Sequence, residues 1–172
     1  MEKYRKDALN MGIVIRRAEQ EDQSELQRLL KYIAALHHAG RPDIFRSGSS
    51  KYDAAQLAEI LQDERKPVFV AADETRHVFG YAFCIVRESG GDALLNSRRI
   101  LYVDDLCVEE QSRGRGLGRA LLEEVKKHAL FLGAQSVELN VWNFNQSAVS
   151  FYEHLGFSVQ KSILELPLNP SL

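Results

Sequence analysis

Two adjacent aspartates, Asp104 and Asp105, interrupt the otherwise apolar run ILYVDDLCV at residues 100–108. Ionised carboxylates are costly to bury unless they are paired or used chemically, so their place in this run needs a reason. A carboxylate beside a cationic amine can hold the amine and can accept one of its protons. That help matters because an alkyl amine with a pKa of about 10.4 is almost fully charged at neutral pH. One aspartate could instead pair with an arginine of residues 96–99 at the surface.

The side chains of residues 100–108 should alternate between two faces, as they do along any strand. The alternation predicts one face with Tyr102, Asp104, Leu106 and Val108, and an opposite face with Val103, Asp105 and Cys107. Cys84 and Cys107 both lie in apolar, strand-like runs, which favours buried thiols. A nucleophilic thiolate would need a positive neighbour, and the residues close to Cys107 offer aspartates instead.

A second chemical feature is the glycine- and arginine-rich stretch QSRGRGLGRALL at residues 111–122. It lacks the Gly-Lys pair of a P-loop and the third glycine of a dinucleotide-binding fingerprint. It is also short and runs directly into a helical pattern, unlike the long arginine–glycine tracts that bind nucleic acid. Two interpretations remain open, a phosphate-binding helix N-terminus and a tight strand-to-helix turn with solvated arginines.

The phosphate-binding interpretation explains why glycines stand at the start of a predicted helix. Gly116 and Gly118 each cost about 1 kcal/mol relative to alanine near a helix start, but bare backbone lets an anion approach several N–H groups. The helix N-terminus adds about half a positive charge, and Arg113, Arg115 and Arg119 add more. A pyrophosphate would suit such a site.

Hydrophobic periodicity predicts the elements that must position these residues. Strand patterns lie at residues 12–18, 67–73, 77–88, 100–108, 136–142 and 157–168. Helical patterns lie at residues 21–38, 53–61, 117–132 and 146–154, the last one ended by Gly156. We therefore expect one α/β (α+β) domain with a mixed sheet over residues 12–172, preceded by an N-terminal extension at residues 1–11.

Composition fits this expectation and excludes some classes of protein. The chain has 172 residues, of which 45% are hydrophobic and 27% are charged, and its formal net charge is −2. This balance argues against a protein devoted to nucleic acid. No apolar run reaches the roughly 18 residues of a membrane span, and residues 1–10 lack the apolar core of a secretory signal. We expect a cytoplasmic protein that binds neither nucleic acid nor membrane.

Two motifs, taken together, resemble a known family. Arg113-x-x-Gly116-x-Gly118 follows an apolar strand, and NVWNFNQSAVSFYEHLGF lies downstream at residues 140–157. The first is similar to the acyl-CoA pyrophosphate loop of the GNAT superfamily of acetyl-CoA-dependent N-acetyltransferases. The second is similar to that family's other cofactor motif, with Asn145, Ala148, Tyr152 and Gly156–Phe157 in register. The element order agrees, and the resemblance covers about residues 12–166.

The resemblance implies a single GNAT-like domain whose mixed central sheet has about six or seven strands flanked by about four helices. The strands at residues 102–108 and 136–142 would splay apart to form the acyl-CoA cleft. The residues expected to bind acetyl-CoA are Leu106, Cys107, Val108, Arg113, Gly114, Arg115, Gly116, Leu117, Gly118, Arg119, Asn145 and Tyr152. The resemblance implies no metal.

The resemblance also implies catalytic roles. Tyr152 would be the general acid near the thioester sulfur, since a phenol of pKa about 10 can protonate a thiolate of pKa about 8.5. From the residues alone, Tyr152 could equally be a core aromatic. The acidic pair resembles the polyamine and diamine acetyltransferase branch, which implies Asp104 as the base and Asp105 as a ligand of the amine. The expected reaction is direct transfer of acetyl to a primary amine in a ternary complex.

Several alternatives stay open at this point. The acceptor could be a polyamine, an amino acid, an antibiotic or a protein, and the domain could instead be a silent acyl-CoA-binding or an RNA-binding module. The loop at residues 36–52 should select the acceptor. His37 and His38 diverge on a helix and have no third ligand nearby, so we expect no metal site there. The apolar stretch SILELPL at residues 162–168 could complete its own sheet or a neighbour's, and we expect a homodimer.

Overall fold

The computed structural model describes residues 12–90, 93, 94 and 96–168, so the expected extension at residues 1–11 lies outside the described part of the chain. The elements in chain order are β1 (Val14–Arg17), η1 (Gln20–Asp22), α2 (Gln23–Gly40), α3 (Ala54–Gln62), β2 (Val68–Ala72), β3 (Val78–Ser89), β4 (Arg98–Val108), η2 (Glu110–Ser112), α4 (Leu117–Phe131), β5 (Ser136–Leu139) and α5 (Gln146–His154). Every strand and helix predicted before residue 157 forms, although β5 ends at Leu139 and not at residue 142.

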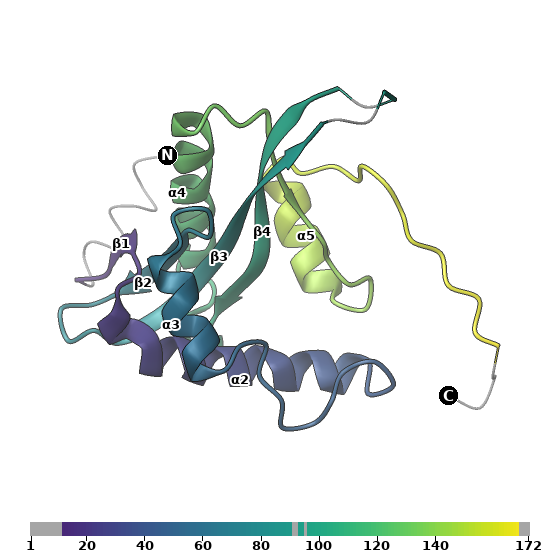
Figure 1. Ribbon diagram of the computed structural model, residues 1–172. Helices are drawn as coiled ribbons and strands as arrows, with labels where there is room; N and C mark the ends of the chain where they lie inside the picture. Colours follow the sequence, from purple (N-terminus) through teal and green to yellow (C-terminus); the bar gives the residue numbers. More distant parts are fainter. Residues whose placement is uncertain (1–11, 91–92, 95, 169–172) are drawn as a thin grey trace.

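The strands form one mixed sheet in the spatial order β1-β2-β3-β4-β5 (Figure 1). Neighbouring strands from β1 to β4 pair antiparallel, whereas β4 and β5 pair parallel. α4 supplies the crossover that a parallel pair requires. The mixed α/β fold is therefore confirmed, with five strands in the sheet where the expectation is about six or seven.

Helices cover both faces of the sheet and create two separate cores. The α4-side core takes the apolar stripe of α4, namely Leu117, Leu121, Leu122, Val125 and Ala129. The α2–α3-side core takes Leu26, Leu29, Leu30 and Leu57 from the two helices on the other face. These side chains recur every three or four residues, so each helix buries one stripe and leaves the other in water. Among the described residues, no helix combines the length and apolar character needed to cross a membrane.

A β-bulge at Asp104 changes the direction of the side chains along β4. Asp105 lies opposite Phe83 and Val103 lies opposite Cys84, so Asp104 is an extra residue that β3 does not match. An extra residue resets the alternation beyond it. Val103 and Asp105 therefore do not share a face, and the alternation predicted from the sequence is wrong from Asp105 onward.

The segment after α5 departs from the strand predicted at residues 157–168. These residues form no strand, and the sheet ends at β5. Phe157 packs against the α4-side core, but the chain beyond it leaves the sheet as an extended arc (Figure 1). The prediction is therefore wrong for a single chain, because a period-two pattern forms a strand only where it reaches a free partner edge.

Candidate active site

β4 and β5 separate near the middle of β4. Residues 100–103 of β4 pair with residues 136–139 of β5, and β4 then continues to Val108. Beyond Val103, the backbone edge of β4 on the β5 side has no strand partner among the described residues. Leu106 and Cys107 lie on this stretch and pair with β3 through their other edge. The open edge fits an extended chain that needs backbone hydrogen bonds, as the pantetheine arm does.

The loop between β4 and α4 has the geometry of an anion-binding turn. Gly114 and Gly116 have φ angles of 75° and 80°, a left-handed conformation that favours glycine. Gly116 is the N-cap of α4, so the first N–H groups of the helix point out of its end. A Cβ added at Gly114 would meet no atom within 4 Å, so the backbone there is open to a ligand. These features support the pyrophosphate interpretation.

Gly118 and Arg113 of the same motif contact other parts of the protein. A Cβ on Gly118 would lie 3.1 Å from Cζ of Phe151, so glycine at this position lets α5 pack closely on α4. Arg113 turns back towards the domain, where its Nη2 donates to Tyr32 Oη at 2.9 Å and its Nε donates to the Val108 carbonyl at 3.3 Å. The close packing of α5 on α4, and not only the approach of an anion, therefore explains why residue 118 is a glycine.

The other residues predicted to bind the cofactor lie at the start of α4 and of α5. Leu117 is buried, Arg115 is exposed, and Arg119 is half-buried in the first turn of α4. Asn145 is the N-cap of α5, and its Oδ1 accepts a hydrogen bond from the Ala148 N–H at 3.2 Å. The motif residue Asn145 therefore stabilises the helix that carries Tyr152.

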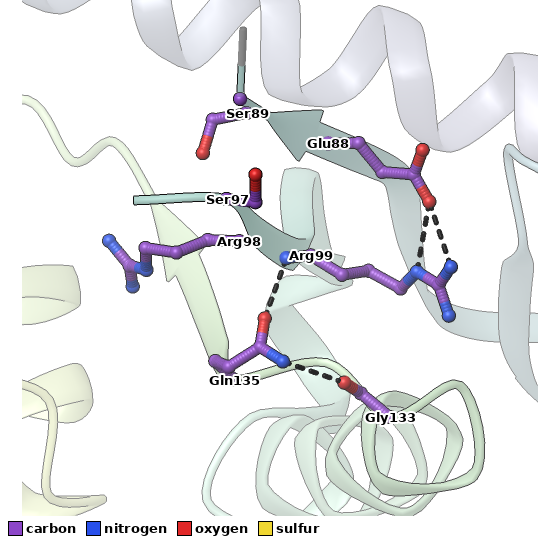
Figure 2. A pocket seen from close by; sticks show the side chains of 8 residues that line it. Glu88, Ser89, Ser97, Arg98, Arg99, Gly133 and Gln135 are labelled. Carbon is purple, nitrogen blue, oxygen red and sulfur yellow. Dashed lines mark hydrogen bonds and ion pairs between the residues drawn. The ribbon is translucent and has the colours of Figure 1, made fainter. Parts of the chain in front are cut away.

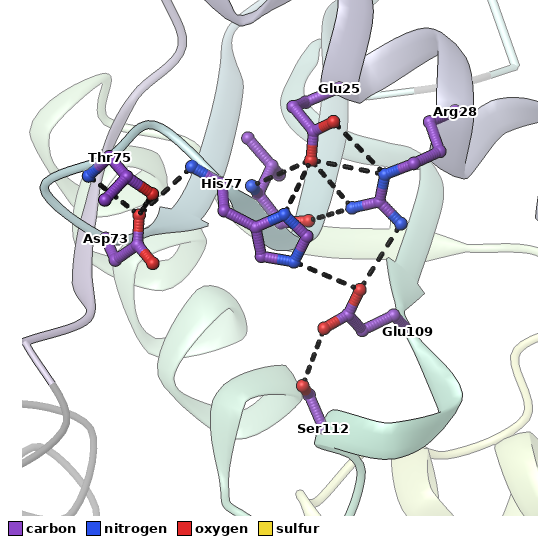
Figure 3. A network of polar contacts seen from close by, with 8 residues as sticks. Glu25, Arg28, Asp73, Thr75, His77, Glu109 and Ser112 are labelled. Atoms are coloured by element: carbon purple, nitrogen blue, oxygen red, sulfur yellow. Dashed lines mark hydrogen bonds and ion pairs between the residues drawn. The ribbon is translucent and has the colours of Figure 1, made fainter.

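A network of charged side chains holds the residues that precede the glycine loop (Figure 3). Glu25 and Arg28 of α2 form an ion pair at 2.8 Å, and Arg28 also lies 3.3 Å from Glu109. His77 lies between the two carboxylates, with Nδ1 3.1 Å from Glu25 and Nε2 3.4 Å from Glu109. Ser112 Oγ donates to Glu109 at 2.8 Å. The network ties α2 and β3 to η2 and so fixes where the glycine loop begins.

The Asp104 carboxylate already has two partners. Lys51 Nζ lies 2.7 Å from Asp104 Oδ2, and Tyr52 Oη donates to the same oxygen at 2.5 Å. Burial and the hydrogen bond to Asp104 raise the pKa of Tyr52, so this phenol remains a donor. Arg98 and Arg99 pair with other carboxylates, so the cation beside Asp104 is a lysine and not an arginine of residues 96–99.

Asp105 lies in a drier environment on the same side of the sheet. It accepts a hydrogen bond from Tyr81 Oη at 3.0 Å, and Tyr81 is buried in the α2–α3-side core. Burial raises the pKa of Asp105 from 3.8 to about 6, and the positive charge of Lys51 opposes part of this increase. A carboxylate with this pKa is mostly ionised at neutral pH, yet it is a stronger base than an ordinary aspartate.

Tyr152, on α5, lies within electrostatic range of Asp105. Burial and the Asp105 charge raise the pKa of Tyr152 well above 10, so the phenol keeps its proton. Its ring packs edge-on against Phe151 and Phe157, with ring centroids 5.2 and 5.6 Å away. The core-aromatic and general-acid interpretations are therefore compatible, because apolar packing fixes a ring that lies near the candidate base.

Both cysteines are free and buried. Burial raises the pKa of Cys84 and of Cys107 to about 12. A thiol with this pKa is not ionised at neutral pH, so Cys107 is poorly suited to act as a nucleophile. The buried-thiol prediction is confirmed.

An aromatic cluster joins the loop at residues 36–52 to the chain after β5. His37 stacks on Phe45 at 5.0 Å between ring centroids, and Phe45 meets Trp142 edge-on at 5.2 Å. Nδ1 of His38 lies 2.7 Å from the Phe45 carbonyl. The two histidines thus serve to fold the loop. Lys51, near the end of the loop, donates to the Asp104 carbonyl at 2.8 Å, on the stretch of β4 that has no β5 partner.

A hollow of about 530 Å³ lies elsewhere, between the β3–β4 hairpin and the turn from α4 to β5 (Figure 2). Arg98, Arg99 and Gln135 line it, and Arg99 pairs with Glu88 at 2.9 Å. This hollow is at the end of β4 opposite to Asp104. It brings together no candidate catalytic groups, so we do not assign the active site to it.

Comparison with known proteins gives the family. The sequence pattern of the acetyltransferase (GNAT) family matches residues 32–157, which is more than half of the chain. The chain belongs to the GNAT acetyltransferase family. The matched region runs from α2 through Phe157, and it contains both aspartates, the glycine loop and Tyr152.

Relatives of this GNAT protein include several acetyltransferases. It is 31% identical over 132 residues to a mycothiol acetyltransferase from Propionibacterium freudenreichii subsp. shermanii, which covers 76% of this chain but only 40% of that protein. It is 26% identical over 154 residues to thialysine N-epsilon-acetyltransferase from Bos taurus, which covers 84% of this chain and 83% of that protein. The crystal structure of a mutant BH1408 protein from Bacillus halodurans matches with a TM-score of 0.87 and 32% identity, covering 91% of this chain and 99% of that chain.

Three side chains that contact the aspartates of this GNAT protein were not predicted from the sequence, namely Lys51, Tyr52 and Tyr81. Lys51 and Tyr52 lie within the loop predicted to select the acceptor, but nothing in their spacing connects them with Asp104. Tyr81 lies opposite Cys107 in the β3–β4 register, and pairing the two strands from their apolar patterns would have placed it near Asp105.

Proposed function

We propose that this GNAT protein transfers an acetyl group from acetyl-CoA to a primary amine of a small molecule. One observation carries the proposal: Asp105 accepts a hydrogen bond from the buried Tyr81 on the stretch of β4 that extends beyond β5, and its charge helps to keep the phenol of Tyr152 protonated. Acetylation of an amine needs a base for the nitrogen and an acid for the departing sulfur. These two side chains have the required protonation states at neutral pH.

Acetyl-CoA would bind along the open edge of β4 and at the glycine loop. The backbone of residues 106–108 would pair with the pantetheine arm, and the N–H groups of residues 114–119 would hold the pyrophosphate at the α4 N-terminus. Main-chain N–H groups of β4 would polarise the thioester carbonyl. Both features are made of backbone, which explains why the side chain of Arg113 is free to bind Tyr32 instead.

The proposed reaction is a direct attack within a ternary complex. The amine nitrogen forms a bond to the thioester carbonyl carbon, Asp105 accepts a proton from the amine, and the carbon–sulfur bond breaks. The departing thiolate takes a proton from Tyr152 Oη. The proton on Asp105 then returns to the Tyr152 phenolate, which restores both residues. An amide and a free thiol leave, and a substrate that arrives as an ammonium ion releases one further proton to solvent.

The contacts favour Asp105 over Asp104 as the base. Lys51 and Tyr52 share one oxygen of Asp104, so its negative charge is already balanced. Asp104 would instead hold the loop that borders the acceptor. The opposite assignment, with Asp104 as the base and Asp105 holding the amine, stays a prediction that the variants of Asp105 and Asp104 test separately.

A cationic alkyl amine is the acceptor that these groups favour. Lys51 balances the charge of Asp104, so the ionised Asp105 leaves the acceptor side with a net negative charge, which attracts an ammonium ion. The bovine relative is named for acetylating the epsilon nitrogen of thialysine, an amine on a small molecule. We further propose a cytoplasmic homodimer that contacts neither nucleic acid nor membrane.

Thermal unfolding with and without acetyl-CoA is the first test, with NAD and ATP as controls. A ligand at about 100 times its Kd adds roughly 2.7 kcal/mol of stability, which raises the Tm by a few degrees for a domain of this size. Thiol release with 1-aminobutane, 1,4-diaminobutane and lysine then tests transfer. No shift with acetyl-CoA, or an equal shift with ATP, would refute the cofactor assignment. A shift without thiol release would indicate a silent acyl-CoA-binding domain.

A further inference from the structure

Lys51 places a primary amine beside the two aspartates of the candidate site. Its Nζ lies 2.7 Å from Asp104 Oδ2 and donates to the Asp104 carbonyl oxygen at 2.8 Å. The positive charge of Lys51 also acts on Asp105, where it opposes part of the increase in pKa that burial causes. An ammonium group of the protein itself therefore lies where the proposed reaction needs the ammonium group of an acceptor.

Three other lysines show how an ordinary surface ion pair looks in this protein. Lys66, Lys126 and Lys127 each pair with a carboxylate three residues earlier in the sequence. Lys51 instead contacts a residue 53 positions later in the chain, on the stretch of β4 that extends beyond β5. Of these four lysines, Lys51 is the one whose amine meets residues of the candidate site.

The Lys51 side chain has room to change position. It is 38% exposed and belongs to the loop between α2 and α3. A lysine has a flexible four-carbon stem, so its nitrogen can move by several ångströms while the backbone stays in place. Asp104 and Leu106 lie two residues apart on β4, which corresponds to about 7 Å. The thioester is expected beside residues 106–108, so a movement of this size brings the amine to the acetyl group.

We propose that Lys51 is a self-acetylation site, modified within one chain when acetyl-CoA is bound and no acceptor amine is present. The Lys51 nitrogen forms a bond to the thioester carbonyl carbon, Asp105 accepts a proton from the nitrogen, and the carbon–sulfur bond breaks. Tyr152 Oη gives a proton to the departing thiolate and regains one from Asp105. An amide on Lys51 and free CoA thiol result, and the proton that distinguishes ammonium from amine leaves to solvent.

This inference rests on the proposed function, because it uses the same base and the same acid. It adds that Lys51 and an acceptor from solution compete for the same carboxylates. A saturating cationic amine should therefore displace Lys51 and protect it from acetylation. Once acetylated, Lys51 carries no charge and no longer balances Asp104, so two carboxylates then attract the acceptor.

Incubation of the full chain with acetyl-CoA that carries an isotopically labelled acetyl group tests the proposal. Trypsin does not cut at an acetylated lysine, so acetylated Lys51 appears in the uncut peptide of residues 47–65. Lys127 serves as the reference for spontaneous acetylation. Without an added amine, Lys51 should be labelled at least about tenfold faster than Lys127, as expected where a general base assists. The rate per chain should not depend on the protein concentration.

Two comparisons connect the labelling with the site. Asp105→Asn should reduce the labelling of Lys51 to the spontaneous rate and leave Lys127 unchanged, and circular dichroism shows whether this variant is folded. Saturating 1,4-diaminobutane should protect Lys51 in the native protein but should not protect Lys127. Thiol release and acetylated amine, measured in the same samples, report on the proposed function independently of Lys51.

Several results would overturn self-acetylation. Labelling of Lys51 no faster than that of Lys127, in samples where the added amine is acetylated, would refute it and leave the proposed function in place. Equal labelling of Lys51 in the native protein and in Asp105→Asn would show spontaneous chemistry. A rate per chain that rises with protein concentration would show that one molecule modifies another. Absence of both Lys51 labelling and amine acetylation would refute the proposed function together with this inference.

Discussion

Replacing Asp105 with asparagine should remove the proposed base while keeping its shape. The asparagine Oδ1 can still accept the hydrogen bond that Tyr81 Oη donates at 3.0 Å, so the fold of the site should persist. Loss of a general base typically lowers turnover about 10²- to 10⁴-fold. Asp104→Asn is the matched control, because it alters the neighbouring carboxylate on the same strand.

The pH dependence of this loss follows from the pKa of Asp105, which is about 6. With that pKa the carboxylate is about 90% ionised at pH 7 and about 10% ionised at pH 5, which is close to a tenfold change. An aspartate with the ordinary pKa of 3.8 would lose almost nothing over the same range. The advantage of the native enzyme over Asp105→Asn should therefore fall about tenfold between pH 7 and pH 5.

The assay is the initial rate of thiol release at saturating acetyl-CoA and amine, measured from pH 5 to pH 8. The quantity to plot is the ratio of native to variant rates, because the ionisation of the substrate amine cancels in it. Asp104→Asn should keep an acidic limb but move it to lower pH, because the charge of Asp104 contributes to the raised pKa of Asp105. A flat ratio for Asp105, or a pH-dependent ratio for Asp104 alone, would show that the base has been assigned to the wrong aspartate.

The same variant has an expected effect on stability. The folded-state pKa of Asp105, about 6, lies above its ordinary value of 3.8, so the folded protein binds the proton more tightly than the unfolded chain does. Burying the ionised carboxylate lowers the free energy of unfolding. This destabilisation is absent below about pH 4, grows between about pH 4 and pH 6, and is complete above about pH 6. Asp105→Asn should therefore stabilise the protein at pH 7 by up to about 3 kcal/mol. Urea unfolding at pH 4 and pH 7 measures the difference.

Three further predictions concern neighbouring groups. Lys51→Met removes a charge that lowers the pKa of Asp105, so the acidic limb of the pH–rate profile should move to higher pH, whereas Lys127→Met on the far face of the sheet should leave the profile unchanged. Tyr152→Phe should lower turnover by about 10²-fold or more with acetyl-CoA binding, measured by calorimetry, preserved. Asp22→Asn breaks a buried ion pair with Arg16, 2.6 Å long, and should destabilise the domain by about 3 kcal/mol in urea unfolding.

Each of these predictions has a result that would contradict it. If the acidic limb of the pH–rate profile stays at the same pH in Lys51→Met, the lysine charge does not lower the pKa of the catalytic base. Full turnover in Tyr152→Phe would assign protonation of the sulfur to another group or to water. For Asp22, burial alone would raise the pKa, but hydrogen bonds from Arg16 and the Glu19 N–H outweigh it and lower the pKa. The stability from this pair should thus be present at neutral pH and be lost in acid, and a pH-independent loss would argue against an ionic contribution.

The sequence by itself determined the helices, the strands before residue 157 and the position of the glycine loop. Helix α4 is visible from its leucine stripe, and the positions of Gly114 and Gly116 follow from a need for left-handed backbone before a helix. Both signals are local, because they depend on periodicity and on the conformational freedom of single residues. Local signals can be read without knowing how distant parts of the chain meet. They also sufficed for the family resemblance.

Tertiary structure decided the arrangement of the proposed catalytic groups. The bulge at Asp104 arises from the register between β3 and β4, and no pattern within β4 records it. The same holds for the pairing of Asp104 with Lys51, a residue 53 positions earlier in the chain. The pKa of Asp105 depends on burial, which exists only after both cores have formed. The segment after Phe157 has the pattern of a strand, but whether it pairs depends on which free edge lies within reach, and that is a property of the folded molecule and its neighbours.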